Sequence, residues 1–546
     1  MKTIDRALLG AALLALAQPA AAQIAPAAAE IAPAAARTAP PARIDTLKAR
    51  AAEGVTNRAK LAQVINDKVF SFGELGFQEF ETSKYLTALL EKQGFTVKRG
   101  VAGLPTGWTA TWTHGTGGPV IALGSDIDGI PKASQKPGVP TRDPLVPGAP
   151  GHGEGHNSGQ AMNIVAALAL KELMQKENIP GTLMLWPGVA EELVAGKAFM
   201  VRDGVFTGVD ATIFSHVGDN LAVSWGMPRG TGNTSVLYSF HGASAHSAAK
   251  PWVGKSALDG VELMNIGWNF RREHLRPEQR SHYVITDGGD QPNVVPSEAT
   301  VWYFFREQSF EAIARNFAIG NRMAEAAAMM TDTTVTRQIV GTAAPRYFNK
   351  PMAEAAAANM ARVGLPAWDA ADQALAHAVQ KSIASDKQEG LATRLTGLEL
   401  PVEKPESGGS DDIGDISWIM PTITITYPSN IPGLPGHHWA NAISMATPIA
   451  HKGIVAGSKV MAMTLVDLLV DPALLPAAKA FFKDVQTRDQ QYQPVLTAAD
   501  KPMTTLNAAI MAEFRPAMTK FYYDETRYPS YLAQLGVAWP SVPVQK

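Results

Sequence analysis

The chain has 546 residues, of which 46% are hydrophobic, so it is long enough for about two or three domains with a core of their own. Its 48 Lys plus Arg nearly balance 50 Asp plus Glu, for a formal net charge of -2, and no basic stripe with interleaved aromatic residues occurs, which argues against a nucleic-acid partner. No uncharged apolar run past the N-terminal segment is long enough to span a bilayer, so we predict no membrane partner.

The N-terminus has the pattern of an export signal. A charged start is followed by an apolar stretch over residues 7–17 and by the small residues Ala20–Ala22. We predict a signal peptide over residues 1–22 and an Ala/Pro-rich linker over 23–43. An ordinary helix is the alternative, but Pro19 and the Ala/Pro tract would leave it nothing to pack on. We therefore expect a periplasmic or secreted protein, and the absence of cysteine is compatible with an oxidising compartment.

Short β-type runs alternate with helical patterns from about Ile44 onward. Strands separated by helices predict an α/β fold whose sheet carries helices on both faces. The expected elements are strands at Trp108–Trp112, Val120–Leu123, Thr182–Trp186 and Ala211–Phe214, and a helix at Gln160–Gln175.

The pattern changes near Ser224 and changes back after Pro345. Between them, two strand-like runs flank an amphipathic helix, which predicts a smaller α+β insert; the runs are Ser235–His241 and Ala299–Phe305, and the helix is Ala257–Trp268. A further buried-type strand at Thr422–Tyr427 indicates that the first domain closes around this insert. The expected boundaries are 44–225 and 346–480 for the two parts of the first domain, 226–345 for the insert, and 481–546 for a C-terminal extension without recognisable chemistry.

Four dispersed clusters offer potential metal ligands, and each is weak alone. In the glycine-rich segment 151–157, Glu154 and His156 are two residues apart, so their side chains point the same way in an extended loop. The glycines let the backbone approach an ion closely. A flexible polar loop explains the same segment equally well.

The other three clusters lie near the ends of expected elements. Glu191 and Glu192 follow the run that ends at Trp186, and adjacent carboxylates there repel each other unless cations lie nearby. His216 follows an apolar run at the expected carboxyl edge of the sheet, the usual location of α/β active sites. His437 belongs to a turn-like segment. Taken singly, these residues also fit a solvated helix start, a core histidine and a surface loop.

Together, five residues supply ligand groups for a metal site, with Glu191 left over. Imidazole and carboxylate suit Zn²⁺, and also Mn²⁺ or Co²⁺. Five ligands exceed the need of one tetrahedral ion but suit two ions that share a bridge. Such a pair lowers the pKa of a bound water from about 15.7 toward roughly 7, and Glu191 can take the proton and pass it to a leaving nitrogen. The predicted ligands are Glu154, His156, Glu192, His216 and His437.

In this order the clusters resemble the motifs of the M20 metallopeptidase family, and particularly of its aminobenzoyl-glutamate hydrolase-like branch, over roughly residues 45–470. The resemblance implies a mixed-sheet catalytic domain with helices on both faces, interrupted by a smaller α+β dimerisation (lid) domain, and a homodimer. The matching segments are Glu74–Ser83, Ser125–Pro131, the glycine-rich segment, Glu191–Glu192, His216–Val217, Gly242–His246 with Pro251 and Gly254, Asn293–Pro296, Ser410–Trp418, His437–Trp439 and Ala450–Gly453.

The resemblance also implies residue roles. Glu191 matches the general base, and Glu192, His216 and His156 match metal ligands. His437 rather than His438 matches the final ligand, because it keeps the family's two-residue interval to the tryptophan.

Three further residues are implied to support catalysis. His246 matches a histidine that reaches the partner subunit's site and helps to bind the substrate or the oxyanion, with Asn293 assisting it. Asp128 matches the second aspartate of the family's Asp-x-Asp-Ala-Leu-Pro, here followed by Gly129-Ile130, and is expected to orient a ligand, whereas Asp126 is open to a purely structural role. Without the resemblance, a core histidine and a turn asparagine would be the ordinary interpretations.

One position departs from the branch. Where its members usually have cysteine in a His-x-Cys-Gly-His pattern, this chain has Glu154. A carboxylate can bridge two ions through its two oxygens, so we expect a harder, oxidation-resistant metal site.

The predicted activity is hydrolysis of the amide bond between an acyl or aroyl group and an amino acid. The cofactor would be two divalent ions per subunit, Zn²⁺ or alternatively Mn²⁺ or Co²⁺. Two alternatives stay open: a di- or exopeptidase of the same family, and a non-catalytic periplasmic ligand-binding protein whose metal site Glu154 has spoiled.

Overall fold

The structure is a computed structural model that describes residues 41–402 and 408–544. The predicted signal peptide, residues 1–22, and nearly all of the predicted linker lie outside the described residues.

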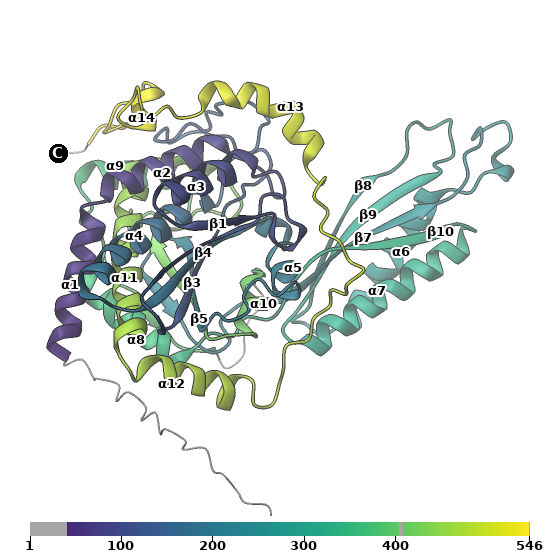
Figure 1. The fold of residues 1–546 in the computed structure, drawn as a ribbon. Helices are drawn as coiled ribbons and strands as arrows, with labels where there is room; N and C mark the ends of the chain where they lie inside the picture. The colour runs from purple at the N-terminus through teal and green to yellow at the C-terminus, as the bar shows by residue number, and fades with distance from the viewer. Residues whose placement is uncertain (1–40, 403–407, 545–546) are drawn as a thin grey trace, which may run out of the picture. The chain divides into compact units, whose positions relative to one another are not determined.

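Eight strands form the main sheet, in the spatial order β1 (Thr96–Arg99), β2 (Trp108–His114), β4 (Gly181–Gly188), β3 (Val120–Asp126), β5 (Ala211–Gly218), β12 (Thr422–Pro428), β6 (Ala222–Ser224) and β11 (Gly397–Glu399) (Figure 1). The four central strands β4, β3, β5 and β12 are parallel to one another. The pairs β1–β2, β2–β4 and β12–β6 are antiparallel, so the sheet is mixed. Each strand predicted for this sheet is present, and most residues of each predicted run are buried.

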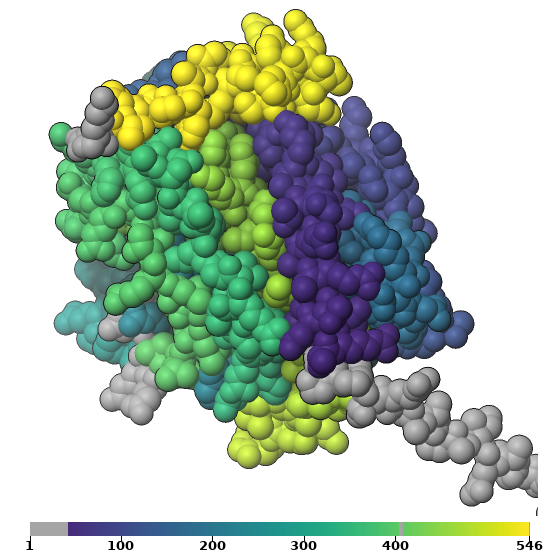
Figure 2. Space-filling view, turned by 90° about the vertical axis from the view of Figure 1, so that its left-hand side faces the viewer, coloured from purple at the N-terminus to yellow at the C-terminus, as the bar shows by residue number. Residues whose placement is uncertain are grey.

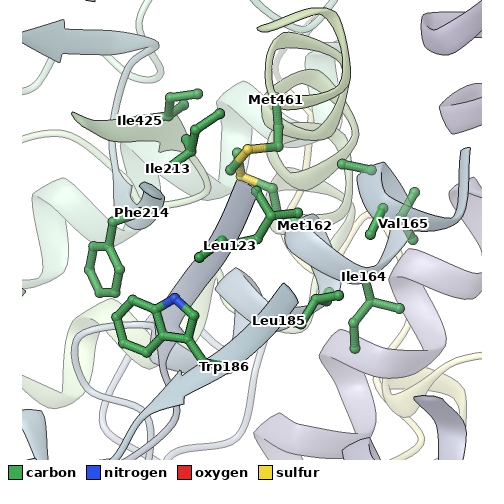
Figure 3. Packing of buried hydrophobic residues seen from close by; sticks show 14 of the residues in the cluster. Leu123, Met162, Ile164, Val165, Leu185, Trp186, Ile213, Phe214, Ile425 and Met461 are labelled. Carbon is green, nitrogen blue, oxygen red and sulfur yellow. The ribbon is translucent and has the colours of Figure 1, made fainter. Parts of the chain in front are cut away.

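Helices cover both faces of this sheet, as predicted. On one face, Met162 and Met461 pack against Ile213 and its neighbours (Figure 3), and on the other face Trp186 stacks on Phe214. The α-helices of this domain are α1 (Pro41–Thr56), α2 (Ala59–Phe72), α3 (Phe80–Lys92), α4 (Gly159–Glu177), α5 (Lys197–Arg202), α8 (Lys350–Val363), α9 (Ala370–Ser382), α10 (Ile413–Ser417), α11 (Pro448–Val470) and α12 (Leu474–Phe481). Short 3-10 turns are η1 (Val101–Gly103), η2 (His156–Ser158), η3 (Glu191–Leu193) and η5 (Trp439–Ile443).

Within the described residues, α11 is the helix long and apolar enough to cross a membrane by length and composition. Most of it is buried inside the fold, as in the core helix of a globular domain. Figure 2 shows it as a yellow-green strip between the purple N-terminal helices and the green segment that contains α8, and it packs against α1, α4 and α8.

The insert is a separate antiparallel sheet in the order β10 (Thr334–Ala343), β7 (Gly232–His241), β9 (Glu298–Glu307) and β8 (Arg280–Asp287), with α6 (Ala257–Arg272) and α7 (Phe310–Met330) on one face and the short turn η4 (Pro251–Val253) near one end (Figure 1). Tyr238 of β7 and Tyr303 of β9 point to the helices. On each strand, the residues next to them in sequence point to the opposite, open face of the sheet. The predicted fold class, an α/β domain interrupted by a smaller α+β domain, is confirmed. We call this insert the lid.

The lid touches the main domain through backbone. A Cβ placed on Gly341 of β10 would lie 2.1 Å from the carbonyl oxygen of Val194, directly after η3. Only glycine allows this approach.

After α12 the chain continues through η6 (Phe482–Gln486), α13 (Ala508–Met518), η7 (Thr519–Phe521) and α14 (Tyr531–Gln534), drawn in yellow in Figure 1. Long stretches of this segment lack regular structure, and it is attached to the remainder of the chain by side-chain hydrogen bonds to backbone carbonyls.

Candidate metal centre

The predicted ligands meet at one edge of the main sheet. Asp126 ends β3 opposite Gly188, the last residue of β4, and His216 lies near the end of β5 opposite Thr426 of β12. Because these strands are parallel, their carboxyl ends share one edge, the usual position of active sites in such sheets. Glu191 is presented on η3, three residues past the end of β4.

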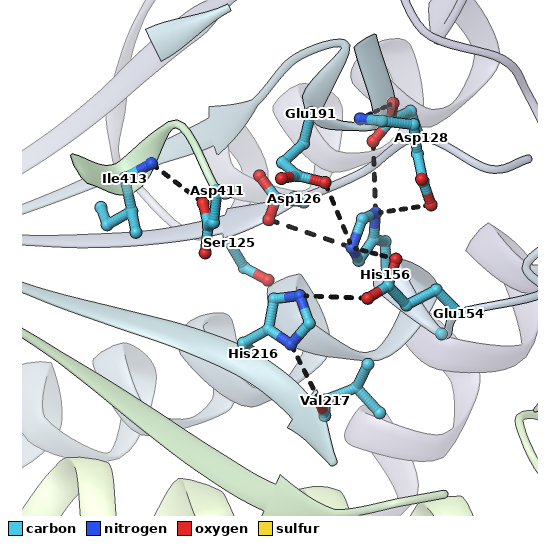
Figure 4. A network of polar contacts seen from close by, with 12 residues as sticks. Ser125, Asp126, Asp128, Glu154, His156, Glu191, His216, Val217, Asp411 and Ile413 are labelled. Carbon is cyan, nitrogen blue, oxygen red and sulfur yellow. Dashed lines mark hydrogen bonds and ion pairs between the residues drawn. The ribbon is translucent and has the colours of Figure 1, made fainter. Parts of the chain in front are cut away.

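Glu154 is joined by ion pairs to both His156 and His216 (Figure 4). Its Oε1 is 3.6 Å from Nε2 of His216, whereas its Oε2 is 3.2 Å from Nε2 of His437 and 3.7 Å from Nε2 of His156. His437 Nε2 also lies 3.2 Å from Oε2 of Glu192. The two oxygens of one carboxylate thus face different imidazoles, the arrangement that a bridge between two ions requires.

Hydrogen bonds fix the ring orientation of two of these histidines. His156 Nδ1 is 3.2 Å from Asp128 Oδ1, and His216 Nδ1 is 2.9 Å from the carbonyl oxygen of Val217. Nδ1 is therefore the donor in each ring, and Nε2 offers its lone pair to the pocket. The other oxygen of Asp128 accepts from the backbone N–H of Glu192 at 3.0 Å, so Asp128 connects both ligand segments.

The donor set fits divalent cations. Four buried atoms that face the cluster lack a hydrogen-bond partner within the described part of the chain: Asp126 Oδ2, Glu154 Oε2, His156 Nε2 and Glu192 Oε1. Two groups of ligand atoms share Glu154, namely Glu154–Glu192–His437 and Glu154–His156–Glu191, each with all atoms within 4.8 Å of one another. Nitrogen and carboxylate donors of this kind suit Zn²⁺, Mn²⁺ or Co²⁺.

Electrostatics point the same way. Burial raises the pKa of the Glu191 carboxyl well above its usual value, and the negative charge of Asp126 raises it further. Burial and Glu154 likewise raise the pKa of Glu192. Buried carboxylates so close together repel one another, and two divalent cations would supply the missing positive charge.

The η3 turn that carries the glutamates is flanked by strained backbone. Ala190 and Val194 have φ values of 54° and 55°, and His437 has a φ of 49°. Residues with a side chain rarely adopt this left-handed region, least of all a β-branched valine. Such strain persists where surrounding contacts hold the backbone, and it is common at functional sites.

Lys197, which the sequence analysis did not identify, is a fully buried cation next to the cluster. Its Nζ lies 2.5 Å from Asp126 Oδ1 and donates to Asp412 Oδ1 as well. The other oxygen of Asp412 accepts from the backbone N–H groups of Gly196 and Lys197, at 3.1 and 2.9 Å. This network joins the end of β3 to the start of α5, directly after the Glu191 turn.

We expect Lys197→Met to destabilise the fold strongly. The change leaves Asp126 and Asp412 buried without their counter-ion, and breaking a buried ion pair on one side typically costs about 3–5 kcal/mol. Urea unfolding measures the loss. Lys176→Met, which removes an exposed ion pair to Glu172, is the control and should change the free energy of unfolding by less than about 1 kcal/mol. Equal effects of both substitutions would contradict the structural role of Lys197.

Two arginines that the sequence analysis also missed line the pocket at the Glu154 cluster, which has a volume of about 280 Å³. Arg306 projects from the open face of β9, donates to Ser410 Oγ at 3.1 Å and lies 5.0 Å from the Phe304 ring centre. Arg346 donates to the carbonyl oxygen of Arg229 at 2.6 Å. The alternation of β9 was the available signal, since Arg306 shares its face with Trp302 and Phe304.

His246 and Asn293 lie elsewhere. Both are exposed and sit together at the far end of the lid, where Ser247 N–H donates to the Asn293 carbonyl at 3.0 Å. Arg306 pairs with Asn233 near the start of β7, and His246 follows the end of that strand at His241. Asn233 and His241 are eight residues apart on this extended strand. The end of the lid that carries His246 and Asn293, which we call the tip, therefore lies roughly 25 Å from the chain's own pocket.

His438, the neighbour of His437, faces another way. Its Nδ1 accepts from the backbone N–H of Ala440 at 3.3 Å, and its ring packs against Trp439. Only His437 of this pair joins the cluster within the described residues.

Comparison with known proteins places these features in context. Residues 231–326 match the model of the peptidase dimerisation domain of the M20 family. The chain is 32% identical to a p-aminobenzoyl-glutamate hydrolase subunit of Escherichia coli (strain K12) over 454 residues, covering 79% of this chain and 94% of that protein. It is 26% identical to Xaa-Arg dipeptidase of Mus musculus, covering 84% and 96%.

A solved structure shares the fold. The aminobenzoyl-glutamate utilization protein from Klebsiella pneumoniae superposes with a TM-score of 0.52 at 17% identity, covering 78% of this chain and 98% of that chain.

Proposed function

This chain belongs to the M20 peptidase family of metal-dependent hydrolases acting on amide C–N bonds, and we propose that its substrate is an N-acyl or N-aroyl amino acid, cleaved into an acid and a free amino acid. One observation carries the proposal. The metal-ligand cluster around Glu154 and the two guanidinium groups of Arg306 and Arg346 line one pocket, which therefore has groups for an amide carbonyl and for a carboxylate.

Two divalent ions, held by Glu154, His156, Glu192, His216 and His437, would polarise the amide carbonyl and acidify a water molecule. We infer Zn²⁺, with Mn²⁺ or Co²⁺ as alternatives, from the mixed nitrogen and oxygen donors. Glu154 supports the bridging position, because each of its oxygens faces a different histidine.

Glu191 is assigned as the general base. It is buried in the pocket wall, 4.0 Å from His156 Nε2, and Glu192 rather than Glu191 faces His437. A carboxylate at this position can take the proton of the attacking water and deliver it to the leaving nitrogen. Asp128, which holds both His156 and the Glu192 backbone, is assigned to orient these ligands.

Arg306 is assigned to the substrate carboxylate. Its guanidinium is held by Ser410 and by the Phe304 ring, so it is already ordered before the substrate binds. Arginine donates two parallel N–H bonds to a carboxylate, which favours amino-acid conjugates over simple amides.

We further propose a homodimer in which His246 acts on the other subunit's pocket. Its Nδ1 accepts from the N–H groups of Ala248 and Ala249, both at 3.2 Å, so Nε2 carries the proton and can donate to an oxyanion. The roughly 25 Å between this tip and the chain's own pocket supports action in trans, with Asn293 beside it. Export to the periplasm is inferred from the N-terminal segment, and cell fractionation tests it.

A substrate panel with metal analysis tests the proposal. Purified protein should contain about two divalent ions per chain and release free amino acid from benzoyl, aminobenzoyl and acetyl conjugates. Faster cleavage of dipeptides would indicate a dipeptidase instead, the activity in the name of the murine relative. Substrate binding without turnover and with substoichiometric metal would indicate a binding protein.

We expect Arg306→Met to raise KM for N-acyl amino acids about 10–100-fold, because a charge-assisted hydrogen bond to the carboxylate is lost. The matched control is Arg280→Met, which lies opposite Arg306 on β8 but is exposed and donates only to nearby carbonyls among the described residues. A substrate with the carboxylate converted to a carboxamide should show little difference between Arg306→Met and the unmodified enzyme. Equal KM changes for both substrates would contradict this assignment.

A further inference from the structure

The C-terminal arm, residues 482–518, crosses from the lid to the turn behind the metal centre and is bound to both. At its start, Tyr492 Oη donates to Asp415 Oδ1 at 2.6 Å, and Asp415 Oδ2 accepts from the N–H of Ala344 at the end of the lid. Leu496 then packs in a buried cluster with Ile339 of β10 and Phe199 of α5. The arm thus contacts the lid and the helix that follows the Glu191 turn.

Further along, the arm attaches to a second turn, residues 74–79, which the sequence analysis matched to the family but to which it gave no role. Gln78 Nε2 donates to the carbonyls of Thr504 and Leu506, at 2.9 and 3.1 Å. Arg515 of α13 forms an ion pair with Glu74 and donates to the Gln78 carbonyl at 2.9 Å. Asn507 of the arm also donates through Nδ2 to the Gly76 carbonyl at 3.1 Å, so four residues of the arm hold this turn from its outer side.

The inner side of the same turn touches the catalytic groups. A Cβ placed on Gly76 would lie 2.9 Å from Ala190 Cα and 3.2 Å from Asp128 Oδ2. Glu79 Oε1 accepts from the N–H of Ala190 at 2.8 Å, directly before Glu191. The carbonyl of Glu74 accepts from the N–H of Gly129 at 2.7 Å, directly after Asp128.

We propose that Arg515 is a positioning residue for the metal centre, acting through Glu74 and the 74–79 turn on Asp128 and the Glu191 turn. The Glu74 side chain is fully buried, and it also accepts from the N–H groups of Glu81 and Thr82 at the start of α3. The Arg515 guanidinium is its cationic partner. Loss of that cation leaves a buried carboxylate unpaired, and the turn relaxes to hydrate it.

This relaxation reaches the metal ligands by a short path. Asp128 holds His156 through Oδ1 and the Glu192 backbone through Oδ2, so a shift of the turn misorients both. Ligand-orienting groups of this kind typically contribute about 10–100-fold to metal affinity or activity. The C-terminal extension is then part of the catalytic apparatus rather than an appendage.

The experiment compares Arg515→Met with a matched control, Lys68→Met, in the full chain. Each cation joins the C-terminal segment to the main domain through one carboxylate and one backbone carbonyl, but Lys68 contacts Glu525 and the Tyr523 carbonyl and not residues 74–79. The readouts are the chelator concentration that removes half of the bound Zn²⁺, kcat and KM for an N-acyl amino acid, and Tm.

Arg515→Met should lose Zn²⁺ at about tenfold lower chelator concentration and lower kcat about tenfold or more with little change in KM. Arg515→Lys, which keeps the charge, should restore most of both. Lys68→Met should lower Tm alone. If Arg515→Met and Lys68→Met lower Tm equally and neither changes Zn²⁺ retention or kcat, Arg515 is only structural and the proposal is overturned.

Gln78→Leu is the second variant if Arg515→Met does not fold, because it removes the bonds to Thr504 and Leu506 but no charge. It should weaken Zn²⁺ retention in the same direction, and unchanged retention would count against the arm. Among the readouts, only the kinetic ones, kcat and KM, rest on the proposed function. An unmodified chain that binds Zn²⁺ but cleaves no conjugate would refute the proposed function, whereas Zn²⁺ retention still tests Arg515.

Discussion

Substituting Glu191 with glutamine is expected to remove nearly all turnover while leaving the metal content unchanged. Glutamine has the same shape but no basic oxygen, so it cannot take a proton from water, and a general base contributes about 10²–10⁴-fold. Glu191 is 7% exposed, and two groups of potential ligand atoms, Glu154–Glu192–His437 and Asp126–His156–His216, do not include it. Inductively coupled plasma mass spectrometry measures the bound metal, and kcat for a benzoyl amino acid measures turnover.

The neighbouring residue is the control for this substitution. Glu192→Gln weakens a proposed ligand that lies 3.2 Å from His437, so it should lower metal content and activity together. If Glu191→Gln instead loses metal, Glu191 is a ligand. If it keeps both metal and turnover, the general base is another group.

Mixed dimers are expected to recover activity from two inactive chains. His246→Ala removes the tip histidine, and Glu191→Gln removes the base. If the tip serves the opposite pocket of a symmetric dimer, a mixed dimer has one pocket with both groups and one with neither, so it should show about half of the activity of the unmodified dimer. Each parental dimer should lose roughly 10²-fold or more, the usual effect of an oxyanion donor or a base.

Co-expression with two different affinity tags isolates these mixed dimers. If His246 served its own pocket, every pocket of the mixed dimer would lack one group, and its activity would stay at the parental level. Full activity of His246→Ala alone would exclude a catalytic part for the tip. The tip's exposure makes it tolerant of substitution, so Tm should stay unchanged.

The sheet and the insert could be predicted because their strands are apolar runs between helices. Leu183–Trp186 and Ile213–Phe214 are buried on both sides, and such runs carry a strong signal. The edge strand β8, Arg280–Asp287, was missed because its apolar run, Tyr283–Ile285, is only three residues long and most of the strand is exposed. An edge strand is defined by its pairing with β9, which local sequence does not encode.

The metal cluster could be predicted because its residues stand in short motifs near expected strand ends. The structure brings Glu154, His156, Glu192, His216 and His437 into one cluster, although they are scattered over nearly 300 residues of sequence. Lys197 and Arg306 could not be predicted in the same way. A lysine after a glycine is usually exposed, and only the paired strands show that Arg306 faces the pocket.

The C-terminal arm was assigned no function for a related reason. Most of its attachments use backbone carbonyls, such as those of Thr497 and Asp500, which accept from Arg202 at 3.0 and 2.6 Å. Carbonyls are present at every residue, so no pattern of side chains marks the positions that bind.

The backbone contact at Gly341 limits how far the lid can be treated as a module. Excising residues 232–343 to obtain the main domain alone would uncover the carbonyl of Val194 and the strained turn that carries the two glutamates. Inserting a different lid would succeed only if its last strand also had a glycine at the position of Gly341. Exchange of inserts between relatives is thus constrained at one small residue, even where the remainder of the inserted sequence is free to vary.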